Sequence, residues 1–146
     1  MDTIKLIVKS IAPKVDVIYE DDSITCFDFD LNAVIIGKDL MLDDCGFIRH
    51  IIDRHKFVNA QQYSLIFWSI LHELGHYFTG DDGIVSDEDA MQYTICAMIP
   101  REAVDENPNI QSFYFDIENE WNATEWAINW IQTHKLLAKL FNYIVK

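Results

Sequence analysis

The segment His72-Glu73-Leu74-Gly75-His76 constrains this chain more than any other feature. It has the pattern His-Glu-x-x-His and lies in residues 59–79, where apolar side chains recur at helical spacing. Residues four apart share one face of a helix, so His72 and His76 can present both imidazoles to one metal ion. Glu73 is one position further round and can act on a water as general base without binding the metal. We therefore predict a metal site with His72 and His76 as ligands and Glu73 as the catalytic residue.

The alternative interpretation is two surface histidines on an ordinary helix. With five histidines in 146 residues, random placement gives about 0.01 segments of this pattern, so coincidence is a weak rival. Zn²⁺ is the expected cofactor, because zinc prefers imidazole nitrogen and carboxylate oxygen, and catalytic sites leave one position open for water. A catalytic zinc also needs a third protein ligand, and the candidates near this helix are Asp87, Glu88 and Asp89. The alternative for these acids is dipole compensation in the first turn of a helix capped by Ser86.

The remaining pattern predicts an α+β fold. Strand-forming residues between Asp16 and Ile36, with turns at Asp21-Asp22 and Leu31-Asn32, predict a small antiparallel three-stranded sheet. Helices are expected at residues 2–12, 43–55, 59–79, 86–99 and 113–145, with residues 101–111 as a loop. The chain is expected to be a single domain over residues 1–146, with a core at 14–100 and a helical C-terminal tail at 112–146.

Charge and cysteine content narrow the function classes. A net charge of -13 argues against direct binding to nucleic acid, since phosphate backbones are bound by clustered Lys and Arg. No apolar run is long enough to span a bilayer, so no membrane partner is expected. Three cysteines without a Cys-x-x-Cys pair, and no secretory signal, indicate a reduced, cytoplasmic protein. The oligomeric state is left open.

At this point the sequence resembles the ImmA/IrrE-type metallopeptidases of bacteria and their phages or other mobile elements. In that family a helix after the His-Glu-x-x-His segment usually reads Glu-x-x-Ala-Asn/Asp-x-Phe-Ala-Ala and ends in Leu-Met-Pro. Here Asp87 stands at the Glu position, Ala90 at the Ala, Tyr93 at the Phe, and Met98-Ile99-Pro100 at the end. The departures are the shorter Asp87 and the apolar Met91 at the Asn/Asp position.

The resemblance covers residues 60–100 most closely. It implies a gluzincin-like fold, in which the small sheet packs against a helical zincin core, and it implies Asp87 as the third metal ligand beside His72 and His76. It further implies a zinc-dependent endopeptidase of narrow specificity that cleaves a cytoplasmic regulatory protein, such as a helix-turn-helix repressor. A substrate peptide is expected to add as a strand to a sheet edge near Ala33–Ile36.

Two alternatives remain beside the peptidase. One is a binding or regulatory module of the same fold that docks a repressor or antitoxin without cutting it. The other is a structural metal site, which would require a fourth side-chain ligand, with Cys96 as the candidate.

Overall fold

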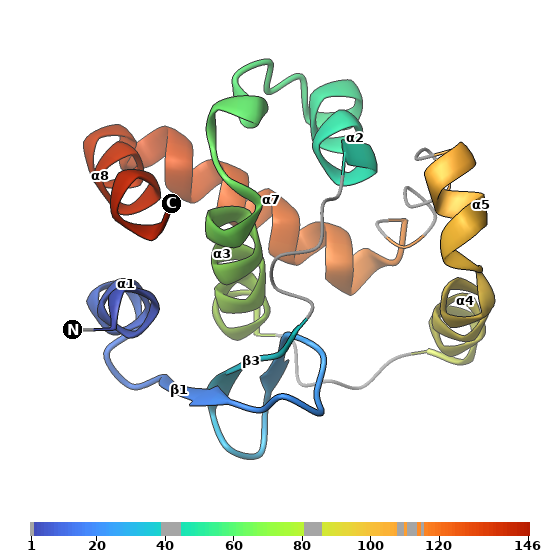
Figure 1. Cartoon of the computed structure of the whole chain (residues 1–146), viewed down its shortest axis with the longest axis horizontal. Coiled ribbons are helices and arrows are strands. Elements are labelled where there is room, and N and C mark those ends of the chain that lie inside the picture. Colours follow the sequence, from blue (N-terminus) through green and yellow to red (C-terminus); the bar gives the residue numbers. More distant parts are fainter. Residues whose placement is uncertain (1, 39–44, 81–85, 108–109, 111–113, 115) are drawn as a thin grey trace.

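The strands predicted between residues 16 and 36 form one small sheet in the computed structural model (Figure 1), which describes residues 2–38, 45–80, 86–107, 110, 114 and 116–146. They are β1 (Asp16–Tyr19), β2 (Cys26–Asp28) and β3 (Ala33–Ile36). Their order in the sheet is β1-β3-β2, with β1 parallel and β2 antiparallel to β3. The sheet is therefore mixed, and the prediction of an all-antiparallel arrangement is wrong, although the α+β class and the three strands are confirmed.

The burial of β3 explains this topology. All four of its residues are buried, and such a continuous apolar run is typical of a central strand covered on both faces. Asn32 closes the tight turn before β3 with a left-handed backbone at φ 51°, which places β2 antiparallel beside it. Because β1 then pairs with the other side of β3, Ala33–Ile36 is not an edge, and the predicted addition of substrate there is wrong. The sheet edges are β1 and β2.

Most helices form where they were predicted but are shorter than expected. They are α1 (Thr3–Ile11), α2 (Cys45–His55), α3 (Leu65–Phe78), α4 (Asp87–Met98), α5 (Arg101–Glu106), α7 (Glu118–Thr133) and α8 (Lys135–Val145), with a 3₁₀ turn at Ala60–Gln62. Side-chain caps set three of the starts, because Asp2, Ser64 and Ser86 each accept a hydrogen bond from a backbone N–H in the first turn of α1, α3 and α4.

Two helix expectations need correction. Residues 101–106 were expected in a loop but form α5, which begins directly after Pro100. The long C-terminal helix is interrupted at His134, whose backbone is not helical and whose ring stacks on Trp130 with the centroids 4.6 Å apart. As a result α8 turns away from α7 (Figure 1).

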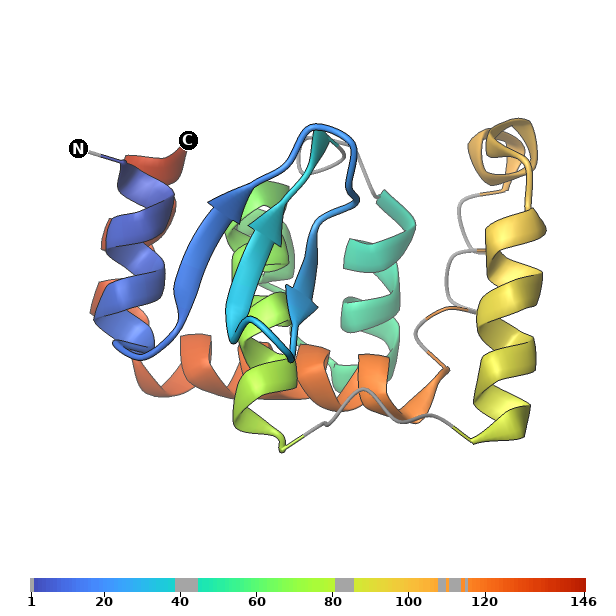
Figure 2. The same ribbon diagram turned by 90° about the horizontal axis from the view of Figure 1, so that it is seen from below.

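Helix α3 lies at the centre of the molecule. The sheet covers one side of it and α7 crosses it on another, so that both contribute to a single hydrophobic core (Figure 2). Buried residues of α1 and α8 belong to the same core, and these two helices lie side by side at one end, near both termini. Helices α4 and α5 form the opposite end. Within the described residues, none of the helices combines the length and apolar character needed to cross a bilayer.

Candidate metal centre

Three polar side chains of α3 lie in the protein interior. His72, Glu73 and His76 are all buried, although they belong to a helix whose other buried residues are apolar or Gly75. The rings of His72 and His76 lie 4.9 Å apart and nearly perpendicular, as expected for residues one helical turn apart. Burying polar groups costs free energy unless they find partners. These three side chains therefore need polar partners in the interior.

A fourth buried polar residue, Glu120 of α7, completes a possible metal site. Its side chain is only 4% exposed, which is rare for a glutamate. Glu120 Oε2 lies 3.3 Å from His72 Nε2, and Glu120 Oε1 lies 3.2 Å from His76 Nε2. One donor atom from each of the three residues falls within 4.8 Å of the others, so His72, His76 and Glu120 form a group that can hold a metal ion.

The separations within this group bring all three residues within reach of one ion. The histidine–carboxylate separations of 3.3 Å and 3.2 Å end on different oxygens of Glu120, Oε2 and Oε1, and one donor atom from each residue lies within 4.8 Å of the others. For comparison, two nitrogen or oxygen ligands at 2.0–2.2 Å from a tetrahedral zinc lie about 3.4 Å from each other. Two imidazoles and one carboxylate also match the ligand set of open catalytic zinc sites, in which a fourth position is left for water.

Thr124 fixes the orientation of His72. Its Oγ1 lies 2.9 Å from His72 Nδ1, and both groups are buried. A histidine that binds a metal through Nε2 carries its proton on Nδ1, so with a metal bound this N–H would donate to the threonine hydroxyl. Thr124 is one turn after Glu120 on α7, and one helix therefore supplies both a metal-site carboxylate and the partner that orients a histidine.

Tyr114 holds the other side of Glu120. Its hydroxyl donates a 2.7 Å hydrogen bond to Glu120 Oε1. Burial raises the pKa of Tyr114 well above its ordinary value, and the negative charges of Glu120 and Glu73 raise it further, so it stays a neutral donor. Burial also tends to raise the pKa of Glu120, but the close contacts of its carboxylate with the imidazoles of His72 and His76 outweigh that effect and lower this pKa. Glu120 is therefore an ionised carboxylate, the form that binds a cation.

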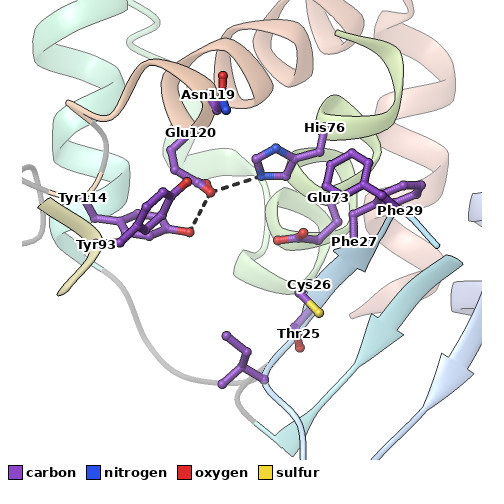
Figure 3. Close-up of a pocket in the computed structure, with 11 residues that line it drawn as sticks. Thr25, Cys26, Phe27, Phe29, Glu73, His76, Tyr93, Tyr114, Asn119 and Glu120 are labelled. Carbon is purple, nitrogen blue, oxygen red and sulfur yellow. Dashed lines mark hydrogen bonds and ion pairs between the residues drawn. The ribbon is translucent and has the colours of Figure 1, made fainter. Parts of the chain in front are cut away.

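The metal group opens into a pocket of about 360 Å³ between the sheet, α3, α4 and α7 (Figure 3). Glu73 points into this pocket from α3, and it is not a member of the ligand group. The edge strand β2 and its flanks line the opposite wall. The lining residues with apolar or aromatic side chains are Ile24, Phe27, Phe29, Tyr93 and Tyr114. Among the described residues that line the pocket, none is Lys or Arg.

Asp87, predicted as the third ligand, lies elsewhere. It is exposed in the first turn of α4 and does not belong to the metal group. Helix α4 reaches the pocket through Tyr93, which packs edge-on against Tyr114. Asp87 is six residues earlier, about 9 Å along α4 and about 120° away around its axis. Asp87 therefore does not lie in the group that can hold a metal ion, where Glu120 accompanies His72 and His76 instead, and Asp87 is one of the acids that offset the dipole of α4.

The family pattern itself contained the signal for Glu120. Residues 120–127 also follow the family's helix pattern. Glu120 stands at the Glu position, Ala123 at the Ala, Thr124 at the polar position, Trp126 at the aromatic position and Ala127 at the following Ala. In this alignment the first position is a Glu instead of the shorter Asp87, and the Asn/Asp position is a polar residue instead of Met91. The acids considered from the sequence are the ones nearest the His-Glu-x-x-His segment, whereas the carboxylate that meets the two histidines lies 44 residues beyond His76.

Comparison with family models, with curated proteins and with solved structures finds no match to this chain. The resemblance to ImmA/IrrE-type peptidases therefore depends on the motif residues alone.

Proposed function

We propose that this protein is a zinc-dependent endopeptidase whose metal ligands are His72, His76 and Glu120. The observation that supports it most is the buried convergence of two imidazoles and one carboxylate, whose donor atoms lie within 4.8 Å of one another. The second is the separate carboxylate of Glu73 in the adjoining pocket. A bound zinc ion would supply Lewis-acid polarisation of a peptide carbonyl and make water acidic enough to be deprotonated near neutral pH.

The protein's own residues divide the remaining work. Glu73 accepts the proton of the attacking water and passes it to the leaving amine, the task of a general base that becomes a general acid. Glu120, His72 and His76 would hold the ion, and Thr124 and Tyr114 keep two of these side chains in place through hydrogen bonds. Because Glu73 is not a ligand in this scheme, its charge affects turnover and not metal binding.

The pocket suggests where a peptide binds. Strand β2 is a sheet edge and borders the pocket opposite Glu73, so a peptide that pairs with β2 passes beside the metal ligands. The aromatic and apolar lining favours an apolar side chain near the cleaved bond. Together with the resemblance to ImmA/IrrE-type peptidases, this supports a regulatory protein such as a helix-turn-helix repressor as the substrate.

Replacing Glu73 with glutamine tests the proposal. We expect Glu73→Gln to bind one zinc ion per chain, as the unmodified protein does, and to lose hydrolysis. The assay is zinc-loaded protein acting on a proteome-derived peptide library, with new amino termini identified by mass spectrometry. Glu125→Gln is the matched control, because Glu125 is an exposed residue of α7 and the chemical change is the same.

The two readouts separate the competing outcomes. Hydrolysis that survives Glu73→Gln refutes the assignment of the base. Loss of zinc from this variant moves Glu73 into the ligand set. Stoichiometric zinc without cleavage of any library peptide, or of any repressor from the native host, leaves the non-cleaving regulatory module as the better description.

A further inference from the structure

Positive charge is strongly segregated in this acidic chain. Residues 3–15 and 126–146 contain six of the eleven Lys and Arg residues and none of the 24 Asp and Glu residues. The two segments meet in space, because α1 and α8 lie side by side at the end of the molecule away from α4 and α5 (Figures 1 and 2). Lys9 of α1 already pairs with Asp16. The basic surface is therefore centred on α8.

Helix α8 is apolar on both of its sides. Its inner side, which includes Ala138, Phe141 and Val145, belongs to the hydrophobic core. On the outer side, Leu136 is 83% exposed and Tyr143 is 76% exposed, with Leu140 between them at 52%. Their spacing of four and three residues places all three on one stripe of the helix. An exposed apolar stripe of this kind is a candidate binding surface.

Lysines border this stripe and also line a pocket. Lys139 and Lys146 are exposed, and they flank the apolar stripe along one side of α8, since both lie within about 60° of Tyr143 around the helix axis. Both line a separate cavity of about 220 Å³, together with Tyr63 and Tyr143. No acidic residue lies among its described lining residues. A small cavity with two ammonium groups suits a phosphate-bearing headgroup.

We propose that α8 is a docking surface for an anionic lipid bilayer, with an anionic headgroup between Lys139 and Lys146 and with Leu136, Leu140 and Tyr143 at the acyl boundary. An apolar stripe with a lysine flank is the pattern of a helix that lies in the plane of a membrane interface, where Tyr is also favoured. With eleven residues, α8 lies on the bilayer and does not span it. This proposal departs from the sequence-based expectation of no membrane partner and does not depend on the metal centre.

The composition of the surface favours lipid over protein. Cores of protein–protein interfaces are depleted in Lys and enriched in Arg, whereas every cation in residues 3–15 and 126–146 is Lys. A second copy of this chain packed through α8 would bring the lysines of two identical helices together, which is unfavourable. An anionic bilayer offers negative charge to the lysines of α8 and an apolar layer to its exposed side chains.

Vesicle co-sedimentation of the full chain tests the proposal. The probes are vesicles of phosphatidylcholine alone and of phosphatidylcholine mixed with phosphatidylserine. We expect binding to the mixed vesicles, weakened by salt, and little binding to the neutral ones. Each lysine near an anionic surface contributes favourable electrostatic free energy to binding. Lys139→Gln with Lys146→Gln should therefore weaken binding about tenfold to thirtyfold. Leu136→Ser with Leu140→Ser should weaken it by at least about tenfold.

Matched controls keep charge and hydrophobicity comparable. Lys38→Gln with Lys56→Gln also removes two lysine charges, but at positions outside this surface. Met91→Ser with Met98→Ser removes two exposed apolar side chains of α4. Both controls should bind the mixed vesicles as the unmodified chain does. Circular dichroism and zinc content of every variant report on folding, so weakened binding by a folded, zinc-binding variant supports the surface.

Several results would overturn the proposal. Absence of binding to the mixed vesicles, or equal binding to neutral ones, excludes an anionic lipid surface. Equal losses in the control variants show that net charge or general hydrophobicity is responsible instead of α8. Full displacement from vesicles by inorganic phosphate assigns the cavity to a free anion. A further contrary result is that the chain does not bind vesicles but dimerises or captures an acidic protein. If Leu136→Ser with Leu140→Ser abolishes that association, α8 is a protein-binding surface.

Discussion

Replacing Glu120 with glutamine is the sharpest test of the metal centre. The variant keeps the shape of the side chain and its hydrogen-bonding capacity toward Tyr114 but removes the charge that faces both imidazoles at 3.2 Å and 3.3 Å. Four-ligand zinc sites bind with about 10–16 kcal/mol, so one ligand accounts for roughly 2.5–4 kcal/mol. We therefore expect the zinc Kd of Glu120→Gln to rise about a hundredfold to a thousandfold.

The assay is a titration in which the protein competes with a chromophoric chelator for zinc. Asp87→Asn is the matched control, because it removes one carboxylate charge at the position that the sequence had favoured. It should leave the zinc Kd unchanged within about twofold, since an exposed first-turn acid contributes only a small dipole interaction. Thermal unfolding gives a second readout. Zinc at a hundred times its Kd stabilises the native state by about 2.7 kcal/mol, which raises Tm by roughly 5–10 °C.

The opposite pattern would refute this reasoning. If Asp87→Asn loses zinc and Glu120→Gln keeps it, the ligand lies on α4 and the arrangement of α7 over α3 does not represent the metal-bound state. If both variants bind zinc like the unmodified chain, a histidine pair with other donors holds the ion. A Glu120→Gln protein that is unfolded without zinc shows instead that the carboxylate is needed for the fold, and Glu120→Asp then separates charge from reach.

Three further changes probe the packing around the site. Thr124→Ala should weaken zinc binding about tenfold to a hundredfold by releasing His72, whereas Thr124→Ser should restore it, and an unaffected Kd in the alanine variant argues against the orienting role. Gly75→Ala should lower the free energy of unfolding by about 1–3 kcal/mol or more in urea titrations, because the added Cβ would meet the backbone oxygen of Ala123 at 2.3 Å. Asn142→Ala should cost about 1–3 kcal/mol in the same measurement, since its buried amide bonds two backbone groups that precede α3; a smaller change would mean that water replaces those bonds.

The features that the sequence predicted well are local ones. The spacing of His72 and His76 is fixed by a single helical turn, so their shared face follows from the helix alone. Ser86 was expected to cap α4, and its hydroxyl accepts the N–H of Asp89 at 3.1 Å. The β2–β3 hairpin likewise depends on residues close in sequence, with Asn32 in the left-handed conformation that a tight turn requires.

The features that it missed depend on contacts between distant segments. Whether β1 pairs with β2 or with β3 is decided by the burial of β3 on both sides, not by the turn residues around Asp21. The meeting of Glu120 with the two histidines depends on how α7 crosses α3, whereas proximity along the chain favoured Asp87 as the third ligand. A stronger signal was available in α7 itself. Glu120 and Thr124 lie on the same helical stripe as Ala123, Ala127 and the other buried residues of that helix, and polar residues on an apolar stripe indicate a site.

The metal group exists because α3 and α7 approach unusually closely. Gly75 has no Cβ, and one placed there would lie within 3 Å of the Ala123 backbone, so a larger residue at that position would push the helices apart. Gly75 is adjacent to His76, and Ala123 stands one turn after Glu120 and directly before Thr124. The close contact between Gly75 and Ala123 therefore lies beside the side chains of the site. It brings the Glu120 carboxylate within about 3.3 Å of both imidazoles and the Thr124 hydroxyl within 2.9 Å of His72. The Gly75 position of the His-Glu-x-x-His segment is therefore part of the site's geometry, even though it supplies no donor atom.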